Sequence, residues 1–230
     1  MPRRLSPRLA AVAAQVLPGR AMADVGTDHA LLPVWLVGTK AVPSAIGMDV
    51  ADGPLRMARQ TVLASGGGVE IRCSDGLDSL VAGEVRCVTI CGMGGFTMAE
   101  ILSRGIPRLT GLERVVLQPQ GGETEVRAAM LSLSWHCVEA VLVAERRKHY
   151  VVESWAPGAA LIPWSVADLR WGQLIRSGPD PLFRDWLAQE RADVELGLSK
   201  LSKANMRGHS DEAVLSAEIE VIRSEEARLA

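Results

Sequence analysis

Short apolar runs alternate with helical patterns of apolar residues along positions 21–133. The short runs predict buried strands over 21–25, 44–48, 69–73, 85–91 and 114–117. Between these runs, apolar residues recur at helical spacing and predict helices over 30–38, 54–64, 96–104 and 124–133. Strands that alternate with helices in this way predict βαβ units and therefore a parallel sheet.

Two further apolar runs close this pattern. They cover 137–144 and 149–155, are joined by the charged segment 145–148, and predict an antiparallel hairpin. The predicted fold is therefore α/β, a sheet of seven strands whose last two form the closing hairpin. Such a hairpin is typical of class I Rossmann-like methyltransferases, whereas a dinucleotide dehydrogenase more often continues with parallel strands.

The character of the chain changes after Pro157-Gly158, where proline and glycine interrupt regular structure. A long helical pattern then covers about 182–206, and a second helix carries apolar residues from Val214 to Ile222. Two helices joined by a short turn predict an antiparallel, coiled-coil-like hairpin. We therefore predict two domains, residues 1–158 and residues 159–230.

Polar or glycine residues follow each of the five predicted parallel strands. They are Asp24 to His29, Asp49, Asp75-Gly76, Gly92 to Gly95, and Gln118-Pro119. In an open parallel sheet, ligands bind at the carboxyl ends of the strands. Five such ends in one register predict one continuous pocket.

The residues of the first loop favour one class of ligand. Asp49 ends the second strand and can accept hydrogen bonds from ribose hydroxyls, which suits NAD and S-adenosylmethionine alike. However, Asp28 stands where a dinucleotide loop would hold a pyrophosphate, and a carboxylate there repels phosphate. It suits the ammonium and sulfonium groups of S-adenosylmethionine instead. Asp24 as a helix cap and His29 as a structural histidine remain alternatives.

Composition and charge limit the possible partners. The formal net charge is −2, so any nucleic-acid surface must be a local patch. The four cysteines lie in apolar runs, and no His or second Cys pair completes a zinc pattern, so no metal is expected. No secretory signal or membrane-spanning run is present, which predicts a cytoplasmic protein without membrane contact.

The strand-end motifs resemble those of a known family. They are Asp24-Val-Gly-Thr-Asp-His-Ala-Leu-Leu-Pro33, Asp75-Gly76-Leu77, Gly92-Met-Gly-Gly95 and Leu117-Gln-Pro119. Together they resemble the bacterial TrmK family of tRNA (adenine(22)-N(1))-methyltransferases, over about residues 5–155. The resemblance implies a class I methyltransferase fold, S-adenosylmethionine as methyl donor, tRNA as acceptor and a coiled-coil C-terminal domain. A monomer is expected.

The resemblance also assigns site residues. The donor site comprises Asp24, Gly26, Thr27, Asp28, His29, Asp49, Asp75, Gly76, Gly92 and Gly94. The expected catalytic residues are Asp28, Gly92 and Met93, with the Asp28 carboxylate or the Gly92 carbonyl stabilising the charge that develops on the adenine. Expected acceptor contacts are Gly95, Phe96, Gln118, Pro119 and Tyr150. The residues expected on the RNA backbone are Arg3, Arg4, Arg8, Arg146, Arg147 and Lys148.

Two positions depart from the family pattern. Gln120 stands where Asn is expected, and Phe96 stands where a small polar residue is expected. Phe96 and Tyr150 can stack on the target base or simply pack in the core. Two other functions remain open, namely methyl transfer to a different acceptor and non-catalytic RNA binding by the same fold.

Overall fold

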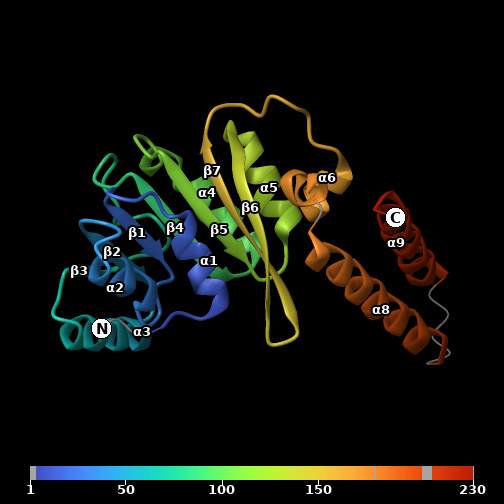
Figure 1. Ribbon diagram of the computed structural model, residues 1–230, viewed down its shortest axis with the longest axis horizontal. Helices are drawn as coiled ribbons and strands as arrows, with labels where there is room; N and C mark the ends of the chain where they lie inside the picture. The colour runs from blue at the N-terminus through green and yellow to red at the C-terminus, as the bar shows by residue number, and fades with distance from the viewer. Residues whose placement is uncertain (1–3, 179, 204–208, 230) are drawn as a thin grey trace. The chain divides into compact units, whose positions relative to one another are not determined.

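The computed structural model describes residues 4–178, 180–203 and 209–229. The chain divides into two compact units, Met1–Ser177 and Gly178–Ala230. Figure 1 shows a helix-covered sheet in the first unit and paired helices in the second. Within the described ranges, no helix is both long enough and apolar enough to cross a bilayer.

The first unit is built on a sheet of seven strands. These are β1 (Met22–Val25), β2 (Ala45–Asp49), β3 (Val69–Cys73), β4 (Cys87–Met93), β5 (Arg114–Pro119), β6 (Trp135–Glu145) and β7 (Lys148–Pro157). Their order is β3-β2-β1-β4-β5-β7-β6. The first five strands are parallel, and β7 pairs antiparallel with both β5 and β6. The predicted seven strands and closing hairpin are confirmed.

Helices cover both faces of this sheet (Figure 1). One apolar core lies beneath α1 (Pro7–Gln15), α2 (Leu31–Gly38) and α3 (Asp52–Ala64). The other core lies beneath α4 (Gly95–Arg104) and α5 (Glu123–Ser132). A short 3-10 helix, Ile106–Arg108, follows α4 and precedes β5. Because the central strands are buried on both faces, their sequences are nearly continuous apolar runs rather than alternating ones.

The closing hairpin is longer than its sequence predicts. Its strands extend to Trp135 and Pro157, beyond the apolar runs at 137–144 and 149–155. A two-residue turn, Arg146-Arg147, joins them, and both residues have left-handed φ values of 49° and 64°. Such turns match the twist of paired strands. Polar residues at the strand ends therefore pair, although the apolar pattern does not predict strands there.

Two short helices, α6 (Val166–Trp171) and α7 (Gln173–Ser177), belong to the first unit. The buried Arg127 of α5 donates from Nε to Glu153 of β7 at 2.8 Å, and from Nη1 to the Leu169 and Arg170 carbonyls of α6. This cluster fixes α6 to the sheet. The compact units accordingly divide after Ser177, whereas the sequence places its domain boundary at residue 158.

The second unit consists of α8 (Pro181–Lys203) and α9 (His209–Arg228). An ion pair joins Arg191 to Glu226 at 3.1 Å, and Arg184 donates to the Leu229 carbonyl. Early residues of α8 thus contact late residues of α9, so the helices are antiparallel, as the sequence predicts for a helical hairpin. The second predicted helix begins at His209.

Candidate active site

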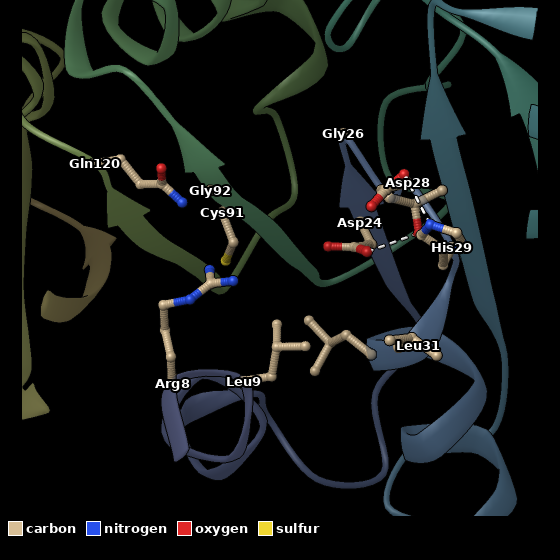
Figure 2. Close-up of a pocket in the computed structure, with 12 residues that line it drawn as sticks. Arg8, Leu9, Asp24, Gly26, Asp28, His29, Leu31, Cys91, Gly92 and Gln120 are labelled. Atoms are coloured by element: carbon tan, nitrogen blue, oxygen red, sulfur yellow. Dashed lines mark hydrogen bonds and ion pairs between the residues drawn. The ribbon is translucent and has the colours of Figure 1, made fainter. Parts of the chain in front are cut away.

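A cavity of about 280 Å³ opens at the carboxyl ends of β1 and β4, which we call the β1–β4 cavity. These strands are neighbours, and the strand order reverses there, which is where open α/β sheets bind ligands. Seven of the predicted site residues line it: Arg8, Asp24, Gly26, Thr27, Asp28, His29 and Gly92. Figure 2 shows Arg8 and Leu9 rising from α1, with Asp24, Asp28 and His29 on the opposite wall.

The Asp24 carboxylate is the buried acidic group of this cavity. It accepts hydrogen bonds from the Thr27 hydroxyl at 2.8 Å and the Thr89 hydroxyl at 2.6 Å. Burial raises the pKa of Asp24 from 3.8 to about 6, and the two hydroxyl groups oppose part of that rise. Asp24 is therefore not a helix cap, because α2 begins after Ala30 with no side-chain cap.

Thr89 is a site residue that the sequence analysis missed. It lies directly opposite Asp24 in the β1–β4 pairing. Its signal in the sequence is weak, since it is one hydroxyl within the apolar run Val88-Thr89-Ile90. Only the strand register shows that this hydroxyl meets the carboxylate.

The loop between β1 and α2 forms the open rim of the cavity. Gly26, Asp28 and Ala30 all have left-handed φ values, of 70°, 49° and 53°. The turn is held by the Asp28 backbone N–H, which donates to the Asp49 carboxylate at 3.2 Å. The Asp28 side chain is 67% exposed and its Oδ1 lies 3.7 Å from His29 Nε2. Asp28 and His29 thus face solvent at the mouth, while Asp24 lies beneath them.

The glycine run after β4 shapes the other side of the cavity. Gly92 has a φ of 79° at a register shift between Cys91 and Met93, so the strand bulges there. A Cβ on Gly92 would lie 3.7 Å from the side-chain nitrogens of Arg8 and Gln120. Farther along, Gly95 packs directly on Gly122, whose carbonyl oxygen would lie 1.8 Å from a Cβ at position 95.

Met93 and the cavity glycine Gly26 are also in contact. A Cβ on Gly26 would lie 2.6 Å from Met93 Cε. The tip of Met93 therefore occupies the space that a side chain at position 26 would need. The side chain of Met93, a predicted catalytic residue, thus borders the β1–α2 loop.

Arg8 lies inside the site rather than on an outer basic face. Its guanidinium donates to Gln118 Oε1 and stacks 5.6 Å from the centre of the Tyr150 ring. Its backbone N–H donates to the Glu145 carboxylate at 3.0 Å. Gln118 and Tyr150 are therefore bound to Arg8, and Pro119 beside them is buried. The side chain of Arg8 and that of Asp24 place opposite charges in one cavity.

The other predicted residues lie outside the β1–β4 cavity. Asp75 pairs with Arg104 at 2.7 Å, and Gly76 packs on Ile101 with a left-handed φ of 57°. Gly76 is thus a glycine because of its backbone conformation and this contact. Phe96 is 73% exposed at the start of α4, next to Gly94, which caps that helix.

The remaining predicted RNA contacts lie outside the β1–β4 cavity. Arg4 and Arg146 line a separate groove, described below, and Arg147 and Lys148 are exposed. Arg3 lies outside the described residues. Five residues that the sequence analysis did not assign complete the cavity wall: Leu9, Leu31, Leu32, Cys91 and Gln120. Burial raises the pKa of the Cys91 thiol well above its usual value, so it lines the cavity as a neutral group. Helical spacing places Leu9 on an apolar face, but it cannot show that this face ends at a ligand site.

Comparisons with known proteins identify the family. A family model described as "Methyltransferase domain" matches residues 5–152. The tRNA (adenine(22)-N(1))-methyltransferase of Bacillus subtilis is 37% identical over 195 residues, which cover 84% of this chain and 79% of that protein. The chain belongs to the TrmK family. The sequence resemblance is therefore confirmed, as is the Rossmann-like methyltransferase fold.

Solved structures of TrmK-family and related proteins superpose closely on this chain. The structure of Bacillus subtilis TrmK has a TM-score of 0.86 and 29% identity, covering 97% of this chain and 99% of that one. Sp1610 of Streptococcus pneumoniae, solved with S-adenosyl-L-methionine, has a TM-score of 0.87 and 29% identity, covering 97% and 100% of the two chains. These shares include the C-terminal helices as well as the methyltransferase sheet.

Proposed function

We propose that this chain transfers a methyl group from S-adenosylmethionine to N1 of adenine 22 in tRNA. The β1–β4 cavity, with Asp24 facing Arg8, carries this proposal. Support for the acceptor comes from the Bacillus subtilis relative, which bears this activity in its name. Support for the donor comes from the Streptococcus pneumoniae relative, which was solved with S-adenosyl-L-methionine.

The cavity residues fit the amino-acid end of the donor. That end carries an ammonium and a carboxylate, and the cavity offers a buried carboxylate at Asp24 and a guanidinium at Arg8. Gly26 turns the β1–α2 loop at the edge of the cavity with a left-handed φ of 70°, a conformation that favours glycine. Asp49 ends β2 beside this loop and holds it through the Asp28 N–H, which leaves carboxylate lone pairs for ribose hydroxyls.

The chemistry requires no proton transfer in the methylation step. The donor supplies an electrophilic methyl group on sulfur, and the adenine N1 lone pair forms the new N–C bond as the S–C bond breaks, leaving a cationic 1-methyladenine. Catalysis by this chain then consists mainly of in-line positioning. The exposed Asp28 carboxylate and the Gly92 carbonyl are the groups that stabilise the positive charge on the ring.

The target base must leave its stack before N1 is accessible. Phe96 is the aromatic side chain placed to receive it, since it is exposed and follows Gly94-Gly95 directly. Tyr150 is covered by Arg8 and serves instead to hold that guanidinium in the cavity. Gln118 holds it from the other side.

Two measurements test the function. Calorimetry with S-adenosylmethionine should show one binding site, and Asp24→Asn should weaken that binding at least tenfold. Mass spectrometry of nucleosides from a tRNA transcript should show 1-methyladenosine after incubation with enzyme and donor. A transcript with guanine at position 22 is the matched control and should gain no 1-methyladenosine.

Each outcome separates the two parts of the proposal. Absence of heat with the donor, in a protein that melts cooperatively, would exclude a methyltransferase. Donor binding with methyl transfer to some other position would retain the donor and refute the adenine-22 assignment.

A further inference from the structure

A second and larger hollow adjoins the β1–β4 cavity. It has a volume of about 860 Å³ and lies between the start of α1, the outer side of α2 and the end of α3. We call it the α2–α3 groove. Leu9, His29 and Leu31 line both hollows, so the groove is adjacent to the candidate active site. Nothing in the proposed methylation step uses it.

The charged groups of the groove are of one sign. Among the described residues that line it, Arg4 and Arg146 are the cations, and none is Asp or Glu. Both arginines are exposed. The whole chain has a net charge of −2, so a groove without carboxylates is a local exception. Charge of this kind is complementary to phosphate.

The floor of the groove offers a surface for a planar ring. Trp35 of α2 is half-buried there, and Met57 of α3 is 42% exposed although it is apolar. Half-buried tryptophans and flexible thioethers are suitable contacts for a nucleobase face. A cationic rim above an aromatic floor is the composition of a site that binds a single-stranded nucleotide.

We infer that the α2–α3 groove binds a nucleotide next to the target adenosine, with its phosphate on Arg4 and Arg146 and its base on Trp35. The inference rests on the proposed function, because it takes tRNA as the acceptor. The target base itself must reach the methyl group at the mouth of the β1–β4 cavity, because the donor occupies the interior of that cavity. The shared wall of Leu9, His29 and Leu31 places a neighbouring nucleotide in the groove.

A charge-matched pair of double variants tests the phosphate contacts. Arg4→Gln with Arg146→Gln should raise the Kd for a tRNA transcript roughly tenfold and lower the slope of log K against log salt by about two. Arg59→Gln with Arg108→Gln removes the same charge from exposed sites that line neither hollow and should change Kd less than twofold. Calorimetry with S-adenosylmethionine should give the wild-type Kd for both.

A substrate lacking one base tests the stacking contact. The abasic nucleotide is placed beside position 22, on the side where it reduces turnover by the wild-type enzyme. With this transcript, the KM of the wild-type enzyme should rise about tenfold. The same substitution should have little effect in Trp35→Ala, because the stacking partner is already absent. Trp35→Phe should restore most of the discrimination, and melting temperatures confirm that both variants fold.

The outcomes distinguish this inference from the proposed function. If wild-type enzyme does not methylate tRNA, the proposed function fails. If the wild-type enzyme methylates tRNA, but both double variants weaken tRNA binding equally or neither weakens it, the groove does not bind RNA phosphate. If the abasic penalty persists unchanged in Trp35→Ala, the base does not stack there.

Discussion

Asp24 combines a cost in folding stability with the binding role proposed above. Its carboxylate is buried beneath the β1–α2 loop and is satisfied by two threonine hydroxyls, yet burial still holds its pKa near 6. An ionised carboxylate in this position destabilises the folded state without a ligand. A ligand ammonium would offset that cost, because it pairs with the buried carboxylate. Binding of a cation at Asp24 is therefore favoured.

We predict that Asp24→Asn increases stability at alkaline pH. Because the folded state raises this pKa from 3.8 to about 6, the protonated carboxyl stabilises the fold below about pH 4, and that stability is lost as pH rises through about 6. The neutral amide does not incur this loss. At pH 8 the variant should therefore be more stable by about 2 kcal/mol. Urea unfolding at pH 8 and pH 4 measures the difference.

The control for this prediction is Asp78→Asn, at a carboxylate whose side chain is 58% exposed. It should change stability little at either pH. If Asp24→Asn changes the free energy of unfolding by the same amount at pH 4 and at pH 8, the account of Asp24 is contradicted. The same variant should lose donor affinity even while its stability rises.

At the residue scale, the sequence predicts which residues lie at the cavity better than it predicts which side chains contact one another. Asp24, Gly26, Asp28 and Gly92 were predicted and lie in one cavity, because strand ends meet at the switch point of any such sheet. Thr89 was missed because its role depends on strand register. The contact of Gly76 with Ile101 also depends on packing between distant segments.

Between elements, a tight backbone contact joins the start of α4 to the loop after β5. The Gly95 backbone N–H donates to the Gly121 carbonyl at 2.8 Å, and Gly122 lies against Gly95. Gly95 has no need of glycine for its own backbone angles, since it is the first residue of α4. Space alone excludes a side chain there.

We predict that Gly95→Ala destabilises the protein while Gly94→Ala does not. A Cβ at position 95 would lie 1.8 Å from a backbone oxygen, so the two loops must separate, whereas a Cβ at position 94 has no atom within 4 Å. Gly95→Ala should cost about 2 kcal/mol or more and lower Tm by about 5 °C. Thermal melts of both variants provide the comparison, and equal Tm values would refute it.

The buried ion pair between Arg127 and Glu153 connects three elements. Their side chains are 1% and 3% exposed, and Arg127 also binds the carbonyls at the end of α6. Helical and strand patterns alone treat α5, β7 and α6 as separate segments. The sequence therefore placed a domain boundary at residue 158, before a helix that this arginine ties to the sheet.

We predict that Arg127→Met is strongly destabilising because it leaves the Glu153 carboxylate buried without its cation. The cost should be about 3–5 kcal/mol. The double variant Arg127→Met with Glu153→Met removes both charges and should recover most of that loss. Urea unfolding of the two proteins decides the matter, and a double variant as unstable as the single one would show that packing, not charge, dominates.

For the whole molecule, the proposed donor site lies in the first unit. Every residue that lines the β1–β4 cavity lies between positions 8 and 120, and the first compact unit extends to Ser177. The sequence predicted both the sheet and the helical hairpin, because their periodicities are strong over long stretches. The predicted domain boundary at residue 158 and the end of the first compact unit at Ser177 differ, because compactness depends on which distant segments pack together.

We predict that a chain ending at Ser177 binds S-adenosylmethionine with a Kd within about twofold of the full chain. The reason is that the residues proposed to hold the donor are all retained, with both apolar cores of the sheet. Calorimetry after a cooperative thermal melt measures this. A folded truncated chain without donor binding would show that the C-terminal unit contributes to the site.

The contact between Gly95 and Gly122 also constrains how sequences of this kind can vary. The two positions are 27 residues apart (122 − 95) but share one space, so neither can gain a side chain on its own. Any change at one position demands a compensating shift of the other loop's backbone. Among related sequences, these positions should therefore remain glycine together or change together, accompanied by altered loop lengths after β4 and β5.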